Sequence, residues 1–363
     1  MISGNKGEWS EIYALFKLLG DKKLFAGDAD LKKVESLFYP IIKIIRSESG
    51  GNYEYEIAGD LVVISGGIEE LRIPVKTFFD QAFKLLSEIK GATGAFELPE
   101  TEKFMKSINC GSLKAKSTLK SDIRIVIYDQ RINQSADLGF SIKSQLGGDS
   151  TLLNAGKTTN FIYKIVNCTL TNEEIGDVNC LFIKRGSKTH KDIKGRISKI
   201  KDYSGKFNFE KAENVVFGNN LTLIDSSLPR IIAEIIFLYF TSGYSKIADL
   251  VQEITKLNPL NYDLNAGHPF YSYKIKRFLT DTALGMMPSK VWSGKVDATG
   301  GYLIVKEDGE ILCYHIYNRN QFEDYLFYNT RLETASSSRH DFADIFYEDD
   351  VLYFKLNLQI RFI

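Results

Sequence analysis

Two segments in which apolar residues recur at every second position constrain the fold of this chain most strongly. The segment DIRIVIYD (122–129) has isoleucine at alternate positions, and GFSIKSQLG (139–147) alternates apolar residues with Ser141 and Lys143. A period of two is typical of a β-strand with one apolar face. A short polar stretch joins the segments. The pattern therefore predicts that they pair as a hairpin in a sheet.

This hairpin raises a question about Lys143. A lysine is almost never fully buried without a partner. Lys143 therefore lies either on a solvated face of the strand or in a cleft that needs its charge. Asp122 stands at the entrance of the first strand, and pairing of the two strands would bring it close to Lys143.

Residues 5–19 have the spacing of a helix that begins at an N-cap. Asn5 is the candidate cap, and Glu8, three residues later, is a candidate capping-box partner. Glu8 and Glu11 both fall inside the apolar arc of this helix. A cap and a salt bridge would explain them, and so would a carboxylate aimed into a functional site.

The remaining pattern predicts a chain that mixes helices and strands. Helical spacing covers residues 30–46, 77–90, 228–256 (with Pro229 in its first turn) and 321–329. Strands are expected at 52–64 and 69–75, with hairpins at 300–317, around Asp308-Gly309, and at 344–362. We expect an α/β fold with two regions, 1–215 with the hairpin and 216–363, helical and then β-rich.

Charge is distributed unevenly although the formal net charge is zero. Residues 101–210 hold 19 Lys and Arg against 11 Asp and Glu, whereas residues 1–100 hold 12 against 16. The densest basic run, 184–206, has nine Lys and Arg against two Asp and is expected to form a surface loop or short helix. Such a run fits a surface that meets a polyanion, and it equally fits an ordinary solvated surface.

Several classes of protein are excluded. The four cysteines and four histidines are scattered, which argues against a zinc site or a disulfide framework. Glutamates interrupt the apolar pattern of the first 20 residues, and the apolar run 231–240 is too short to span a bilayer. We therefore expect a soluble, cytoplasmic protein. The segment TLLNAGKTT (151–159) ends like a phosphate-binding loop, but Thr151 replaces the first glycine of that motif.

Asp122 and Lys143 form the strongest chemical pattern. Phosphodiester hydrolysis needs a divalent metal, which carboxylates hold, and a nearby lysine can orient the attacking water. Nucleases of the PD-(D/E)XK type place an aspartate before an acidic residue, any residue and a lysine. Here Ser141 occupies the acidic position, 19 residues after Asp122. On spacing alone, an ordinary salt bridge explains the pair as well.

Longer strings carry a more specific resemblance. NKGEWSEIYALFKLL, KSDIRIVIYD, GFSIKSQLG, TLLNAGKTTNFIYKI, DATGGYLIVKEDGEILCYHIYNRNQFEDYL and SSSRHDF followed by KLNLQIRF together resemble the HpaII family of type II restriction endonucleases. The similarity runs from the first helix to the last strand.

The resemblance implies a restriction-endonuclease-like PD-(D/E)XK core, a mixed sheet flanked by helices. It implies Mg²⁺-dependent cleavage of both DNA strands at a short palindrome, with CCGG cut after the first C. Asp122 and Lys143 would be the catalytic pair, with the serine at position 141 a trait of the family. A glutamate of the first helix would complete the metal site, with Glu11 favoured over Glu8, and Gln145 would contact the metal water or the DNA backbone.

DNA contacts are expected from polar loops and from the basic run. The candidates are Arg339, His340, Asn318, Arg319, Asn320 and Lys295 in loops, with Lys194 and Arg196 in the basic run. A cognate DNA methyltransferase is implied, and both a monomer and a homodimer remain open. A catalytically inactive DNA-binding protein and a nucleotide hydrolase are the alternative functions.

Overall fold

The computed structural model of the chain describes residues 1–115 and 121–363. The described chain divides into two compact units, of which each is treated by itself. Unit 1 comprises Met1–Ser150, Ala283–Gly285 and Val296–Tyr325, and unit 2 comprises Thr151–Thr282, Met286–Lys295 and Leu326–Ile363. The expected boundary at 215 differs from this division, because residues 151–215 pack within unit 2 and residues 296–325 pack within unit 1.

One mixed sheet dominates the described part of unit 1. Its strands are β2 (Lys23–Gly27), β3 (Lys33–Glu48), β4 (Gly51–Ala58), β5 (Leu61–Ser65), β6 (Leu71–Pro74), β8 (Ile123–Asp129), β9 (Gln134–Ser144), β15 (Gly301–Val305) and β16 (Ile311–His315). They are arranged in the order β2-β16-β15-β9-β8-β3-β4-β5-β6. The sheet thus joins strands from the beginning of the chain with two strands from its last quarter.

The predicted hairpin is confirmed at the centre of this sheet. Strands β8 and β9 pair antiparallel, with Ile123 opposite Phe140. The second predicted hairpin is confirmed as β15 and β16, joined by a turn in which Gly309 has a φ of 94°. β15 also pairs with β9, in parallel, and places Tyr302 opposite Ser141. The C-terminal region therefore supplies the neighbour of the strand that carries Lys143.

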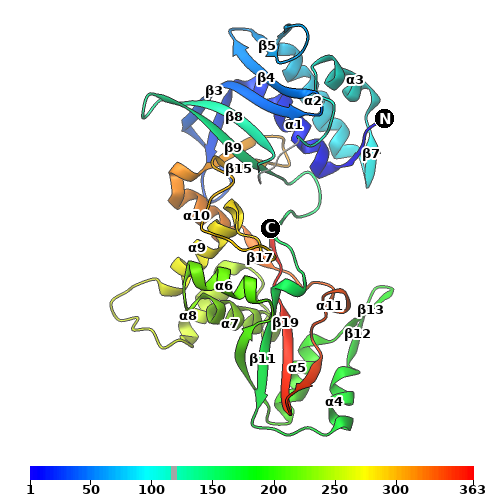
Figure 1. Cartoon of the computed structure of the whole chain (residues 1–363), viewed down its shortest axis with the longest axis vertical. Coiled ribbons are helices and arrows are strands. Elements are labelled where there is room, and N and C mark those ends of the chain that lie inside the picture. Colours follow the sequence, from blue (N-terminus) through cyan, green and yellow to red (C-terminus); the bar gives the residue numbers. More distant parts are fainter. Residues whose placement is uncertain (116–120) are drawn as a thin grey trace. The chain divides into compact units, whose positions relative to one another are not determined.

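Three helices accompany the sheet, and Figure 1 shows α1, α2 and α3 gathered beside strands β4 and β5. They are α1 (Lys6–Asp21), α2 (Val75–Gly91) and α3 (Pro99–Ser107), and the short strands β1 (Ser3–Asn5) and β7 (Ala95–Glu97) pair with each other. Apolar side chains of α1, among them Trp9, Ile12 and Phe16, share one buried core with Ile125 and Phe140 of the hairpin. Burial of this apolar face is the main force that holds α1 against the sheet.

The expectation of a helix over residues 30–46 is wrong. These residues form most of β3, a 16-residue strand that pairs with β2, β4 and β8. Isoleucine, tyrosine and phenylalanine favour strands, and Pro40 removes a backbone donor that a helix interior would need. Pairing with its two neighbours in the sequence, β2 and β4, and with the distant β8 outweighs the helical spacing of its apolar residues.

Unit 2 contains two sheets and a separate two-stranded ribbon. The sheets have the orders β14-β11-β19-β18 and β10-β20-β17, and the ribbon is β12-β13. The bounds of these strands are β10 (Thr151–Leu153), β11 (Asn160–Val166), β12 (Phe182–Arg185), β13 (Lys188–Lys191), β14 (Lys206–Ala212), β17 (Thr330–Leu332), β18 (Ile345–Glu348), β19 (Val351–Asn357) and β20 (Ile360–Phe362). Figure 1 shows β11 and β19 lying side by side, as their antiparallel pairing requires.

Helices complete unit 2, and the chain passes between the units within α9 and α10. The helices that lie wholly in unit 2 are α4 (Asn172–Asn179), α5 (Ile193–Asp202), α6 (Val215–Ile224), α7 (Leu228–Thr241), α8 (Ile247–Leu257) and α11 (Ser337–His340), with one 3₁₀ turn at η1 (Lys157–Thr159). α9 (Phe270–Leu284) and α10 (Arg319–Tyr328) each have residues in both units, and a second 3₁₀ turn, η2 (Ile316–Asn318), belongs to unit 1. The expected helix over 228–256 is thus two helices, and the short helix expected at 321–329 is confirmed.

The other expectations for unit 2 have mixed outcomes. Residues 184–206 form most of a β-ribbon as well as α5, where a loop or short helix was expected. The hairpin expected at 344–362 is confirmed as β18 and β19, followed by β20. Residues 157–159 make one 3₁₀ turn that leads into strand β11, whereas a phosphate-binding loop would lead into a helix.

The observed fold is mixed α/β, as the sequence predicts. No helix built by residues 1–115 and 121–363 is both long enough and apolar enough to cross a membrane.

Candidate active site

Asp122 and Ser141 meet across the central hairpin of unit 1. Asp122 directly precedes β8, and its backbone N–H donates to Phe140 O (2.8 Å). Its Oδ2 accepts hydrogen bonds from the Ser141 hydroxyl (3.0 Å) and from the Ile142 N–H (2.7 Å). Both bonds fall on the same oxygen, which fixes the carboxylate and leaves Oδ1 without a hydrogen bond from any described residue. Ser141 therefore orients the aspartate.

Lys143 lies two residues further along β9 and is partly buried. Its Nζ stands 5.4 Å from the ring centroid of Tyr302, on the adjacent strand β15. Burial lowers the pKa of Lys143, while the charges of Asp122 and Glu11 act in the opposite direction. No carboxylate among the described residues lies within ion-pair distance of its Nζ. Lys143 is therefore partly buried beside two acids and, within the described chain, forms an ion pair with neither of them.

Glu11 is the acid on α1 that belongs to this electrostatic cluster. Burial, followed by the negative charge of Asp122, raises the pKa of Glu11 from 4.5 to about 8, and Lys114 and Arg46 oppose the shift. Within the described chain no side chain donates a hydrogen bond to its carboxylate. Because the negative charge of Asp122 disfavours ionisation of Glu11, a cation bound by both carboxylates would stabilise their charged forms.

Glu8 has a different place, at the start of α1. Its Oε2 accepts from Asn5 N (2.9 Å) while Asn5 Oδ1 accepts from Glu8 N (3.1 Å), so the predicted capping box is confirmed. Lys114 Nζ lies 3.3 Å from Glu8 Oε1. The hydrogen bond with Asn5 is the largest cause that lowers the pKa of Glu8. These contacts account for Glu8 as a helix cap and leave Glu11 as the glutamate beside Asp122.

The donor set fits magnesium better than a metal that needs an all-protein cage. No three His, Cys, Asp or Glu side chains of residues 1–115 and 121–363 cluster closely enough to hold a metal. Magnesium is usually bound through one or two carboxylates, with water and substrate phosphate oxygens completing its shell. Oδ1 of Asp122, which accepts no hydrogen bond from the described residues, and the carboxylate of Glu11 are the oxygens that would form such a pair.

Gln145 follows the end of β9. Its backbone N–H donates to Val305 O (2.9 Å), and its side chain is partly buried. Ser141, Lys143 and Gln145 are spaced two residues apart in the sequence, the period at which side chains of a strand point to the same face. Its predicted contact with the metal water or DNA stays a prediction.

Three of the predicted DNA-contacting residues belong to unit 1. Asn318 hydrogen-bonds with Arg131 (2.9 Å) and with the Tyr39 hydroxyl (3.0 Å). Arg319 donates to Glu323 (2.6 Å), and Asn320 is exposed. Asn318 is therefore fixed by the protein, whereas Asn320 is exposed to solvent.

Four other predicted DNA-contacting residues belong to unit 2 and are at least partly exposed. Arg339 and Lys295 are exposed, and His340 is partly buried next to Arg339 in α11. Burial is the largest cause that lowers the pKa of His340, and the charge of Arg339 adds to it. Lys194 is exposed and donates to Ser242 O (2.8 Å). Each of these side chains is accessible at least in part, and their contacts with DNA remain predictions.

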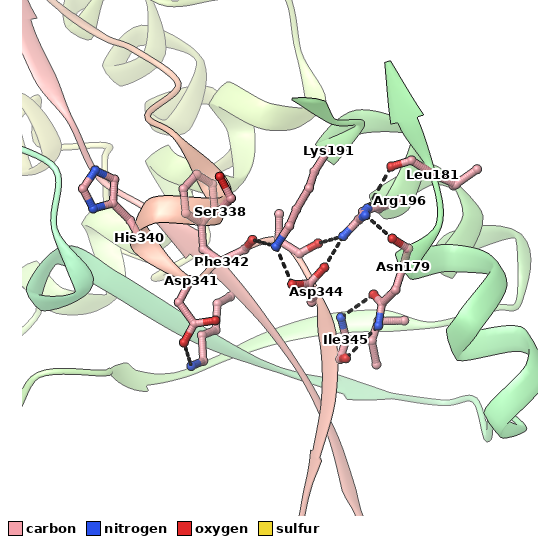
Figure 2. Close-up of polar contacts among 12 residues, drawn as sticks. Asn179, Leu181, Lys191, Arg196, Ser338, His340, Asp341, Phe342, Asp344 and Ile345 are labelled. Carbon is pink, nitrogen blue, oxygen red and sulfur yellow. Dashed lines mark hydrogen bonds and ion pairs between the residues drawn. The ribbon is translucent and has the colours of Figure 1, made fainter. Parts of the chain in front are cut away.

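The expectation for Arg196 is contradicted, because its side chain is 0% exposed. Figure 2 shows the Arg196 guanidinium beside Leu181 and Asp344. It donates to Leu181 O (3.1 Å), to Ala343 O (2.7 Å) and to the carboxylate of Asp344. A buried guanidinium with its donors occupied cannot reach a phosphate or a base. The sequence could not reveal this, because the acceptors come from segments far from position 196.

The sequence also gave no signal for Tyr302. It reaches Lys143 only because β15 is paired with β9, and residues more than 150 positions apart share no local pattern. Arg46, which opposes the pKa shift of Glu11, is likewise buried on a distant strand, where it pairs with Glu48 (2.6 Å).

Known proteins resemble this chain along its whole length. The family model described as HpaII restriction endonuclease matches residues 5–362. The type II restriction enzyme HpaII of Haemophilus parainfluenzae is 48% identical over 365 residues, which cover 99% of this chain and 99% of that enzyme. No solved structure matches the chain. Because both matches cover nearly the whole chain, the chain belongs to the HpaII restriction endonuclease family.

Proposed function

We propose that this enzyme is a Mg²⁺-dependent type II restriction endonuclease with a PD-(D/E)XK core, and that it cuts both strands of DNA at CCGG after the first C. The proposal rests above all on the oriented Asp122 carboxylate beside the unpaired Lys143 on neighbouring strands. Cleavage would leave a 5′-phosphate and a 3′-hydroxyl. The enzyme would act in the cytoplasm, together with a DNA methyltransferase that protects the same site.

Each residue of the site has a role that follows from its surroundings. Asp122 Oδ1 and the carboxylate of Glu11 would hold Mg²⁺, which supplies activation of water and neutralisation of phosphate charge. Ser141 and the Ile142 N–H keep Asp122 in one orientation. Lys143 orients the attacking water and stabilises negative charge as it develops on the phosphate. Burial lowers the pKa of Lys143, and the negative charges of Asp122 and Glu11 oppose that shift.

A palindromic site has two-fold symmetry, so the proposal includes a homodimer on DNA. Sedimentation of the protein with and without a duplex that contains one CCGG site measures this directly. A complex of two chains per duplex is expected.

Cleavage of defined DNA tests the activity itself. A linear duplex with one CCGG site is incubated with Mg²⁺ or with EDTA, and a duplex with the site scrambled to CGCG serves as the control. Two fragments whose sequenced ends begin with 5′-CGG, formed only with Mg²⁺ and only from the first duplex, are expected. Salt-sensitive binding to the first duplex without any cut would instead indicate an inactive DNA-binding protein. Cutting of both duplexes would contradict the proposed specificity.

A further inference from the structure

The ribbon formed by β12 and β13 stands apart from the sheets of unit 2. Its strands pair from Phe182 opposite Lys191 to Arg185 opposite Lys188. The turn between them contains Gly186, whose φ of 61° lies in the left-handed region that glycine adopts readily. Neither strand pairs with any other described strand. The ribbon is therefore a hairpin arm with a tight turn at its tip.

The outer part of this arm is exposed and basic. Lys184, Lys188 and His190 are all exposed, as is Thr189 between them. Neither lysine has a carboxylate within ion-pair distance among the described residues. Phe182 and Ile183 are also unusually open for apolar side chains, at 55% and 40% exposed. A surface that combines unpaired lysines with largely exposed apolar side chains is typical of one that binds another molecule.

The base of the arm, by contrast, is firmly clamped. Buried Arg196 donates to Leu181 O (3.1 Å), directly before β12, and its guanidinium carbon lies 5.3 Å from the Phe182 ring centroid. Asp192 N, directly after β13, also donates to Leu181 O (3.0 Å). The two ends of the hairpin are therefore held together at one carbonyl and one guanidinium.

The same clamp ties the arm to the segment before β18, as Figure 2 shows. Lys191 Nζ donates to Phe342 O (2.9 Å) and pairs with Asp344, which also pairs with Arg196. Asn179 exchanges two hydrogen bonds with the backbone of Ile345 (3.0 and 2.8 Å). An isolated two-stranded hairpin is only marginally stable in water, so this anchoring is what keeps the arm extended.

Pairing in the ribbon determines what its two faces carry. Residues that stand opposite each other point to the same face, so Lys191 shares a face with Phe182, and His190 shares the other face with Ile183. The first pair is the one held at the Arg196 clamp. On the second face, the side chains of Ile183, His190 and Lys188 form no hydrogen bond or ion pair with any described residue.

We propose that this arm enters the major groove of the substrate DNA and that Lys184 and Lys188 contact the duplex there. The inference rests on the proposed function, which makes duplex DNA the substrate. Strands about 4.8 Å apart with their side chains fill a groove about 12 Å wide, whereas the minor groove is only about 6 Å wide. Two unpaired lysines beside a small glycine turn give the tip positive charge and let its backbone approach base edges.

The test compares the double variant K184A/K188A with the matched control K103A/K246A, which removes two exposed lysines elsewhere. Binding to a duplex with one CCGG site is measured in Ca²⁺ across a range of salt concentrations. The arm variant is expected to bind about tenfold more weakly, and the slope of log affinity against log salt should become shallower by about 2. The control variant should bind like the wild type.

Dimethyl sulfate protection of guanine N7 reports on the major groove, since that atom lies there. The wild type at saturation should protect at least one guanine, and K184A/K188A at saturation should lose that protection. The inference would be overturned if K184A/K188A bound DNA as tightly as the wild type, or if K103A/K246A lost as much affinity as K184A/K188A. It would also be overturned if K184A/K188A bound more weakly but still protected the same N7 atoms. If the wild type cuts at CCGG and K184A/K188A binds DNA with the same affinity and N7 protection, only the proposed role of the arm is refuted. A wild type that neither binds nor cuts duplex DNA would refute the proposed function as well.

Discussion

The hydroxyl of Ser141 lies 3.0 Å from Oδ2 of Asp122 and donates a hydrogen bond to it across the β8–β9 hairpin. The serine that replaces the expected acidic residue thus supports the carboxylate that remains. A hydrogen bond to a charged group contributes about 1.5–3 kcal/mol. The position is therefore useful to the site even without a charge of its own.

Replacing Ser141 with Ala tests this support. The S141A variant should fold normally and cut CCGG DNA about 10- to 100-fold more slowly, because the Asp122 carboxylate loses one of its two donors. Single-turnover cleavage rates measure the effect. S141T keeps the hydroxyl and should recover most of the rate. Equal rates for S141A and the wild type would show that the hydrogen bond has no part in cleavage.

Replacing Lys143 with Ala should abolish cleavage and leave binding almost intact. The charges of Asp122 and Glu11 both act on the pKa of the partly buried Lys143 ammonium, so this variant removes the positive charge that stands beside both acids. A loss of at least about 10²–10³-fold in the single-turnover rate is expected. Gel-shift affinity in Ca²⁺ should change by less than about fivefold. If K143A cut DNA at the wild-type rate, Lys143 would have no catalytic role.

The pKa of Glu11 predicts a dependence of stability on pH. In the folded state the pKa is about 8, above its ordinary value of 4.5. Below pH 4.5 Glu11 is protonated in the folded and unfolded states, so it does not affect stability. As the pH rises from 4.5 to 8, the unfolded state loses this proton more readily, and the folded state loses stability relative to it.

The E11Q variant should therefore be more stable than the wild type at pH 8, by about 2–4 kcal/mol, and similar to it at pH 4.5. Denaturant unfolding in EDTA at both pH values measures the difference. E8Q, the same substitution one helical turn earlier, is the matched control and should show no such gain. Mg²⁺ should narrow the gap at pH 8, because it binds the wild-type carboxylate. A difference independent of pH would contradict the shifted pKa.

Replacing Glu8 with Ala separates the cap from the metal site. E8A removes the acceptor for Asn5 N and should lower the free energy of unfolding by about 1 kcal/mol. The concentration of Mg²⁺ needed for half-maximal cleavage should stay within about twofold of the wild-type value, whereas E11Q should raise it at least about tenfold. If E8A raised the required Mg²⁺ concentration more than E11Q did, Glu8 and not Glu11 would be the metal ligand.

Local sequence patterns were sufficient wherever short-range chemistry specifies the structure. The alternation in 122–129 and 139–147 predicted the β8–β9 hairpin, and Asn5 with Glu8 predicted the start of α1. Asp308-Gly309 likewise predicted the turn between β15 and β16. In each case the determining contacts join residues close in the chain, so their identities are visible side by side in the sequence.

Contacts between distant segments settled the rest. The spacing of 30–46 fits a helix, yet residues 43–45 pair with β4 on one edge and with the distant β8 on the other, and the segment is part of β3. Arg196 reads as a surface cation, and backbone carbonyls of residues 179, 181 and 343 enclose it. Nothing in the sequence distinguishes Glu11 from other glutamates. Its pKa is raised only because the fold buries it and places it beside Asp122. Burial and electrostatic coupling depend on which surfaces meet in space, and a linear pattern does not record those meetings.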